Sequence, residues 1–106
     1  MKSFDLYGQR CGVDLESAHR SAEKALDFRF IAHESSYHGG DYYRFGDVGT
    51  EHFVLKRNYD GFEKEWAESR FKEHSILLYV NESQRAAALE RLLTSEGFEL
   101  LRRENL

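Results

Sequence analysis

Apolar side chains recur along this chain first with the period of a strand and then with that of a helix. Between residues 3 and 7, Phe4 and Leu6 alternate with Ser3, Asp5 and Tyr7, which predicts a half-buried strand. From residue 15 to 26 the apolar positions 15, 18, 22 and 26 follow helical spacing. Because a carboxylate can accept hydrogen bonds from the first backbone N–H groups of a helix, Asp14 is predicted to cap this one.

The middle of the chain favours strands. Residues 28–33 alternate apolar and polar side chains, as a second strand would. Residues 41–45 and 51–57 form two more strand-like runs, and the intervening Gly46 and Gly49 permit the turn of an antiparallel hairpin. Residues 75–80 are almost continuously apolar, which predicts a strand in the middle of the sheet with both faces covered.

A second helix and a last strand complete the predicted order. Asn81 or Ser83 is positioned to cap a helix with apolar residues at 86, 89, 92 and 93. Gly97 then supplies a left-handed helix end, and Phe98 is predicted to fold back onto Leu93, before a strand at 98–102. The order β-α-β-β-β-β-α-β predicts a single α+β domain over residues 1–106, a ferredoxin-like (split β-α-β) sheet with an added central hairpin.

Composition narrows the classes of function. The chain has 106 residues, 41% of them hydrophobic, no proline and one cysteine, so one folded domain without an internal disulfide is expected. Nineteen acidic against fifteen basic residues give a formal charge of −4, which disfavours nucleic acid as a partner. The N-terminal residues lack the apolar run of a signal peptide and no stretch is long enough to span a membrane, so a cytoplasmic location is expected.

None of the common catalytic motifs is present. His33, His38 and Asp41 match no established ligand spacing, so the sequence predicts no metal and no cofactor. An alternative takes His38 and His52 as the general acid and base of a small nuclease or hydrolase. Cys11 precedes a predicted helix start, where a thiolate can be stabilised, but it has no identified base or resolving partner.

The segment between residues 58 and 74 mixes aromatic and acidic side chains. Aromatic anchors surrounded by charged residues are typical of protein-recognition surfaces, whereas an ordinary loop pinned to the core by its aromatic rings is the competing interpretation. With the neighbouring acidic loops, the predicted partner-binding residues are Asp41, Asp47, Glu51, Tyr59, Asp60, Phe62, Glu63, Glu65, Trp66 and Glu68.

In size, acidity and the segment from Tyr59 to Trp66, the chain resembles the small immunity proteins that bacteria encode beside contact-dependent and other polymorphic toxins. The resemblance implies a non-catalytic domain that neutralises a basic, nuclease-type toxin by covering its active cleft. It transfers no residue by correspondence, because these proteins share no diagnostic motif. A small-ligand regulatory module is a second hypothesis. A homodimer is also compatible with the sequence, if residues 41–45 form a free sheet edge.

Overall fold

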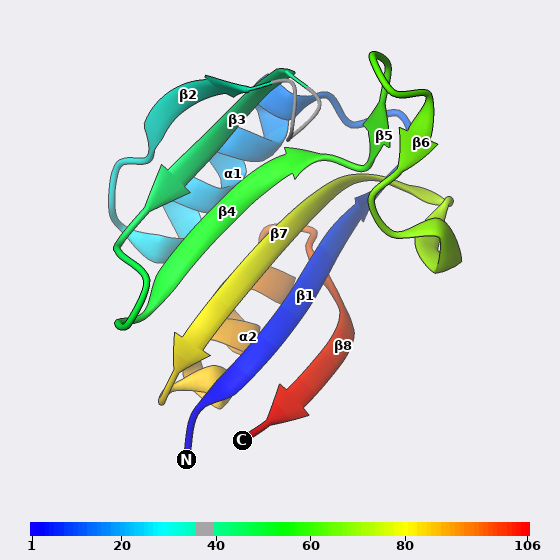
Figure 1. Ribbon diagram of the computed structural model, residues 1–106. Coiled ribbons are helices and arrows are strands. Elements are labelled where there is room, and N and C mark those ends of the chain that lie inside the picture. Colours follow the sequence, from blue (N-terminus) through cyan, green and yellow to red (C-terminus); the bar gives the residue numbers. More distant parts are fainter. Residues whose placement is uncertain (36–39) are drawn as a thin grey trace.

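The computed structural model describes residues 1–35 and 40–106, and it is an α+β structure with two helices (Figure 1). Its elements in chain order are β1 (Ser3–Arg10), α1 (Leu15–Leu26), β2 (Ile31–Ser35), β3 (Gly40–Phe45), β4 (His52–Arg57), β5 (Tyr59–Asp60), β6 (Glu65–Trp66), the 3-10 helix η2 (Ser69–Phe71), β7 (His74–Ser83), α2 (Ala86–Thr94) and β8 (Glu99–Asn105).

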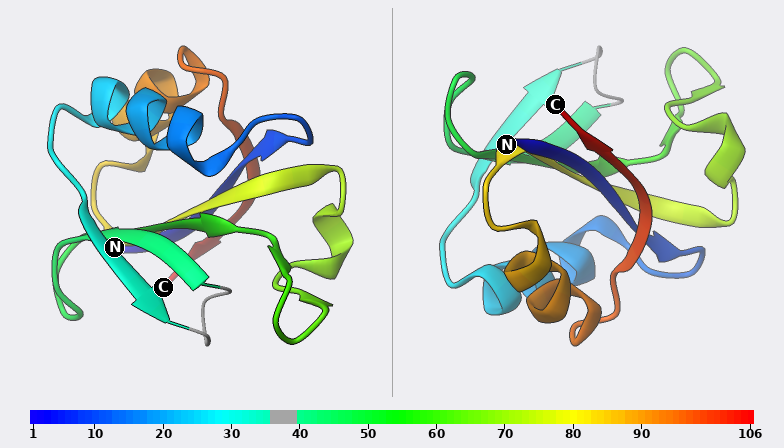
Figure 2. Two further views of the ribbon diagram at one scale, coloured as in Figure 1. Left: turned by 90° about the horizontal axis from the view of Figure 1, so that it is seen from above. Right: turned by 90° about the horizontal axis from the view of Figure 1, so that it is seen from below.

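Six strands form one sheet in the order β2-β3-β4-β7-β1-β8, and every neighbouring pair is antiparallel. Both helices cover the same face of this sheet (Figure 2). The first and last strands, β1 and β8, pair with each other. The two chain ends therefore meet, and backbone hydrogen bonds join Lys2 and Leu106. Among the described residues, no helix is long and apolar enough to cross a membrane.

The main core lies between the sheet and the helices. Tyr7, Phe53 and Leu78 point to this side from three adjacent strands, and each is at most 1% exposed. Ala18 and Ala22 of α1 pack against them, because small side chains let the helix approach the sheet closely. The remaining members of this cluster are Leu15, Ala25, Leu26, Phe30, Leu55, Ile76, Val80, Leu89, Leu93 and Phe98.

The second face of the sheet is partly buried as well. Leu6 and Leu77 are fully buried but belong to no part of the main core cluster. Tyr79 stands opposite Leu6 on this face, and its hydroxyl donates to Glu68 at 2.7 Å. The residues between β4 and β7, here called the β4–β7 segment (residues 58–73), therefore reach over this face. The predicted middle strand at residues 75–80 is part of β7, which lies inside the sheet and has both faces covered.

The first strand is buried on both faces rather than on one. Tyr7 faces the helices, and Ser3 and Asp5 are buried with it. A buried carboxylate needs a partner, and Arg103 of β8 donates to Asp5 at 3.0 and 2.9 Å in a two-pronged ion pair. The alternation of the sequence revealed the strand but not this long-range pairing.

The second strand begins later than the sequence pattern predicts. α1 ends at Leu26, the C-cap residue Asp27 adopts a left-handed conformation, and β2 begins only at Ile31. Between them, Phe30 is a buried member of the main core, and Phe28 packs against that core. The carboxylate of Glu23 accepts the backbone N–H of Phe30 at 2.7 Å, so the crossing itself is held in place.

At α1 the predicted cap is confirmed, because the Asp14 carboxylate accepts the Ser17 N–H at 2.7 Å. The predicted start of α2 is wrong. Asn81 and Ser83 lie in β7, and the residue before α2 is Arg85, which provides no side-chain cap.

The buried face of α2 includes fewer residues than predicted, whereas its C-terminal end is as predicted. Leu89 and Leu93 are buried, whereas Leu92 is 44% exposed. Gly97 has the expected positive φ of 88°, and the N–H of Phe98 returns to the carbonyl of Leu93 at 3.1 Å.

Residues 41–45 do not form a sheet edge. β3 is paired with β2 on one side and with β4 on the other, so the edge strands are β2 and β8. Any second copy that pairs with this sheet by backbone hydrogen bonds therefore has to add at β2 or β8.

Candidate protein-binding surface

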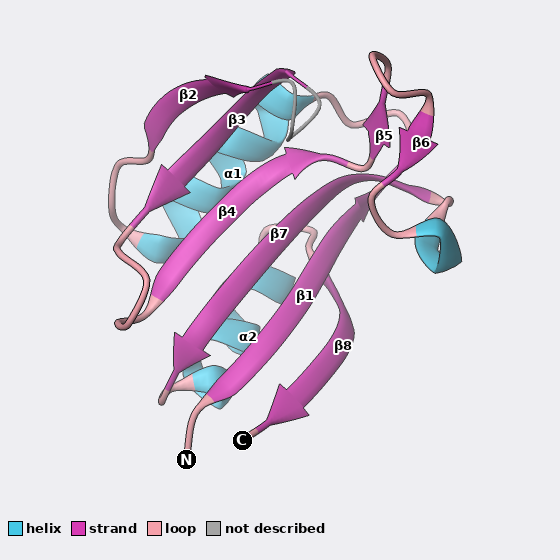
Figure 3. Cartoon of the chain, viewed as in Figure 1, coloured by secondary structure: helices cyan, strands magenta, loops and turns pink. Residues whose placement is uncertain are grey.

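The β4–β7 segment is irregular but firmly attached. Figure 3 shows it as loop with the small β5–β6 ribbon and the 3-10 helix η2, at one end of the large sheet. Its anchor is Asn58, which is completely buried. The Asn58 Nδ2 group lies within hydrogen-bond distance of the carbonyls of Phe71 at 2.9 Å, His74 at 3.0 Å and Glu68 at 3.3 Å, and its Oδ1 accepts the Glu68 N–H at 2.8 Å. One side chain thus ties together the two ends of the segment.

The β5–β6 ribbon has an aromatic and an acidic pair. Tyr59 stands opposite Trp66 and Asp60 stands opposite Glu65, and successive side chains on a strand point to opposite faces. The tip between them turns on Asp60, whose Oδ1 accepts the N–H groups of Phe62 at 2.8 Å and of the next residue at 3.2 Å. The ribbon therefore presents its rings on one side and two carboxylates on the other.

Trp66 is half-buried and held from two directions. The ring of Tyr59 meets it edge-on, with centroids 5.1 Å apart, and the Lys72 Nζ lies 5.9 Å from its ring centroid. Such contacts fix the orientation of an indole without covering it. Nearby, Phe62 is 70% exposed and Tyr59 is 43% exposed. Three aromatic side chains thus gather at the surface of this ribbon.

Two hollows meet at Trp66. One, of about 260 Å³, lies toward the second face of the sheet and is lined by Lys56, Asp60, Glu65 and Tyr79 in addition to Trp66. The other, of about 300 Å³, lies between the ribbon and the start of α1, and its lining is mainly apolar. Trp66 and Arg57 line both hollows.

Glu68 is committed to the protein's own interior network. Arg102 donates to its carboxylate at 3.0 Å and the Tyr79 hydroxyl donates at 2.7 Å. Burial acts to raise the pKa of Glu68, but these hydrogen bonds, with the charges of Arg102 and Lys56, outweigh it and hold the pKa below its usual value. Glu68, one of the predicted partner-binding residues, thus attaches the segment to the sheet.

Asp41 lies near the ribbon. It is exposed at the start of β3, opposite Glu34 of β2. A Cβ atom placed on the neighbouring Gly40 would lie 3.4 Å from the Phe62 ring, so the tip of the ribbon reaches the start of β3. The predicted residues Asp41, Tyr59, Asp60, Phe62, Glu63, Glu65, Trp66 and Glu68 therefore share one end of the sheet.

Asp47 and Glu51 lie elsewhere. They belong to the turn between β3 and β4, at the opposite end of β4 from the ribbon. The Glu51 carboxylate is held by the Arg85 guanidinium at 2.7 to 3.1 Å and accepts the Ser83 hydroxyl at 2.8 Å. Burial raises the pKa of Glu51, yet the hydrogen bonds from Arg85 and Ser83 prevail and lower it.

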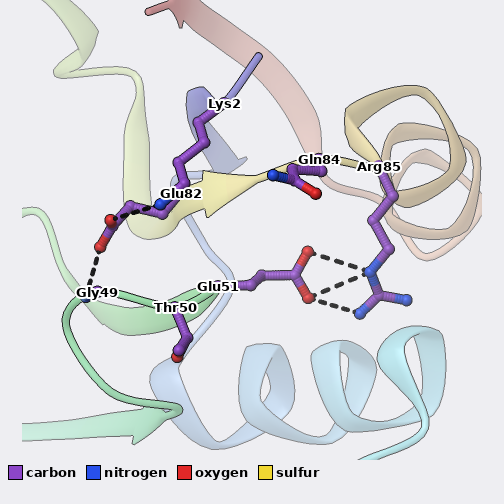
Figure 4. A pocket seen from close by; sticks show the side chains of 7 residues that line it. All are labelled: Lys2, Gly49, Thr50, Glu51, Glu82, Gln84 and Arg85. Carbon is purple, nitrogen blue, oxygen red and sulfur yellow. Dashed lines mark hydrogen bonds and ion pairs between the residues drawn. The ribbon is translucent and has the colours of Figure 1, made fainter.

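Figure 4 shows the hollow that Glu51 lines, which has a volume of about 410 Å³. On its other side Glu82 accepts the Gly49 N–H at 2.8 Å and pairs with Lys2 at 3.4 Å. Both basic side chains of this hollow, Lys2 and Arg85, are thus already paired with carboxylates of the same chain. The hollow is held together by its own ion pairs.

Of the residues of the alternative hypotheses, the structure describes His33, Asp41 and His52. His52 is buried beneath the β3–β4 turn, with Nδ1 at 2.8 Å from the Thr50 carbonyl and 3.5 Å from Glu82. His38 lies outside the described residues. His33 stacks on Tyr42, with ring centroids 5.3 Å apart. Within residues 1–35 and 40–106, no three His, Cys, Asp or Glu side chains are placed to hold a metal ion.

Sequence reasoning missed three features of this surface. Asn58 sits at the junction of a strand and a loop, where Asn is common, but nothing in the sequence reveals the three residues that its side chain contacts, Glu68, Phe71 and His74. Val13 and Leu15 line the apolar hollow from the start of α1, far from the ribbon in sequence. Cys11, which is exposed, lines the same hollow.

Comparison with known proteins adds no relative. No protein-family model matches the sequence, and no curated protein matches it.

Proposed function

We propose that this chain is a non-catalytic protein-binding domain that neutralises a basic, nuclease-type toxin by covering its active cleft, as immunity proteins do. The observation that supports the proposal is Trp66, a half-buried ring held between two hollows on a segment anchored by Asn58. Trp and Tyr side chains seated next to pockets dominate the binding energy of many protein interfaces. Tyr59 and Phe62 extend this aromatic surface.

The anchoring of the segment favours tight binding. A loop that is disordered before binding loses conformational freedom when it docks, and that loss weakens the complex. The buried hydrogen bonds of Asn58 and the network of Glu68 with Arg102 and Tyr79 hold the β4–β7 segment in one conformation beforehand. A partner would therefore meet a preformed surface.

The charge at the ribbon suits a basic partner. Residues 59–66 contain Asp60, Glu63 and Glu65 against a single Lys64. Glu63 and Glu65 form no ion pair with any described residue of the chain. Such carboxylates attract a basic surface during diffusion and so increase the association rate. The whole chain has the same sign, at −4.

The proposal extends to the fold type and the compartment. Strands β8, β1, β7 and β4 adjoin in that order, and a helix follows both β1 and β7. This order supports a ferredoxin-like (split β-α-β) sheet to which β2 and β3 add a hairpin at the β4 edge. Neutralisation before a toxin reaches its target would place the protein in the cytoplasm.

The direct test uses the product of the neighbouring reading frame. Expression of that product alone should arrest growth, and coexpression of this chain should restore it. With the two purified proteins, Trp66→Ala should weaken binding by about 2 kcal/mol, or roughly 30-fold in Kd, mainly through faster dissociation. Leu92→Ala is the matched control, because Leu92 is an exposed apolar residue of α2 on the helix-covered side.

Charge reversals separate the two groups of acidic residues. Glu65→Lys should slow association, and the effect should fade as salt is added. Asp47→Lys changes the charge by the same amount at the other end of β4 and should leave association nearly unchanged. Normal binding and growth protection by folded Trp66→Ala and Glu65→Lys proteins would refute the proposed surface. Absence of binding by the wild-type protein would refute the proposed partner.

A further inference from the structure

The apolar hollow beside Trp66 is built from three parts of the chain that are distant in sequence. Leu15 of α1 and Ile76 of β7 form buried parts of its lining, at 3% and 2% exposure. Val13, Tyr59 and Trp66 line it as well. The start of α1 and the ribbon thus enclose an apolar surface that no described side chain fills.

The size of this hollow points to a side chain rather than a metabolite. At about 300 Å³ it lies at the lower limit of pockets that enclose small-molecule ligands. Hot-spot pockets at protein interfaces instead receive one aromatic or aliphatic side chain, which displaces water from apolar walls. Tyr59 and Trp66 provide such walls here.

The opposite side of the ribbon has a different chemistry. Asp60 and Glu65 face each other across the β5–β6 ladder, where two like charges repel. Asp60 uses one oxygen in the tip turn, and Glu65 has no ion-pair partner among the described residues. Lys56 lines the same hollow and its charge is attracted to Asp60, and a second cationic group beside Glu65 would lower the remaining repulsion further.

We propose that the partner straddles the ribbon, inserting an apolar side chain into the hollow between α1 and Trp66 and placing a basic side chain beside Asp60 and Glu65. This inference rests on the proposed protein-binding function and specifies what the partner must present. It also assigns a role in specificity to Val13, because this residue lines the hollow from outside the ribbon and is only partly buried against the core.

The test measures the chemistry of the hollow without the natural partner. Three capped tripeptides, Arg-Phe-Arg, Arg-Ala-Arg and Glu-Phe-Glu, are titrated into the full chain. Trp66 is the only tryptophan and lines the hollow, so its fluorescence reports occupancy. The expected result is saturable binding of Arg-Phe-Arg, at least tenfold tighter than either control peptide. Equal binding of all three, or no binding at millimolar peptide, would overturn the inference.

Two modifications locate the binding. Val13→Phe places a ring in the hollow and should abolish the Arg-Phe-Arg signal, and thermal melts verify that this variant is folded. If it does not fold, reaction of Cys11 of the native chain with N-phenylmaleimide blocks the same hollow, because Cys11 is the single cysteine and is exposed. Undiminished binding after either modification would place the peptide elsewhere and overturn the inference.

The peptide result is separable from the proposed function. A chain that neutralises the neighbouring gene product yet ignores Arg-Phe-Arg would keep its function and lose only this account of the partner. Conversely, selective peptide binding without neutralisation would support the hollow and refute the toxin as its partner.

Discussion

Asn58→Ala should detach the β4–β7 segment from the sheet while leaving the sheet intact. The substitution removes the amide that bonds the carbonyls of Phe71, His74 and Glu68 and accepts the Glu68 N–H. Each buried polar group left without a partner costs about 1 to 3 kcal/mol. Because Asn58 lines a hollow open to solvent, water can satisfy part of the set. We therefore expect a loss of about 2 to 4 kcal/mol, within the stability of an ordinary domain.

Two measurements check this expectation. Urea unfolding gives the loss of stability, and hydrogen exchange locates it: amides of residues 58–73 should exchange faster, while those of β1 and β7 keep relative protection. Asn81→Ala is the control, because Asn81 is half-buried in β7 and its side chain makes no hydrogen bond with the described residues. An Asn58→Ala protein with wild-type stability and unchanged exchange in the segment would refute the anchoring role.

Three further predictions concern the sheet, the network and a helix end. Leu78→Ala should cost about 2 to 5 kcal/mol in urea unfolding, because Leu78 is completely buried in the middle strand; an unchanged midpoint would contradict its place in the core. Glu68→Gln should lower the free energy of unfolding at neutral pH, and the difference from the wild type should shrink as the pH falls. The reason is that the lowered pKa of Glu68 stabilises the folded state fully above about pH 4.5, and this stabilisation is lost as the pH falls through the pKa of the folded state. A difference that does not change with pH would argue against the ion pair with Arg102. Gly97→Ala should lower stability by about 1 to 2 kcal/mol through its positive φ, measured by thermal melts, and a neutral effect would contradict the left-handed helix end.

The short-range signals in the sequence predicted most elements correctly. Asp14 and Gly97 work within a few residues, through a cap and a left-handed helix end, so their roles follow from local geometry. The apolar run of β7 needs cover on both faces, which places it in the middle of the sheet wherever its neighbours come from. The two helices and the main strands follow from periodicity in the same way.

What depended on contacts distant in sequence was decided only by the tertiary structure. Asp5 can be buried because Arg103, at the other end of the chain, neutralises it. Asp47 and Glu51 are close to the ribbon residues in sequence, yet the length of β4 separates them in space.

The candidate binding surface was likewise determined partly by the sequence and partly by the tertiary structure. The sequence alone determined that residues 59–66 are aromatic and acidic, and therefore candidates for binding. Only the folded chain decided that Trp66 is half-buried rather than part of the core, because Asn58 anchors the segment to the sheet and a hollow lies between the ring and the start of α1. Hydrogen bonds and apolar walls contributed from such distant positions carry no periodic signal, and a sequence pattern cannot register them.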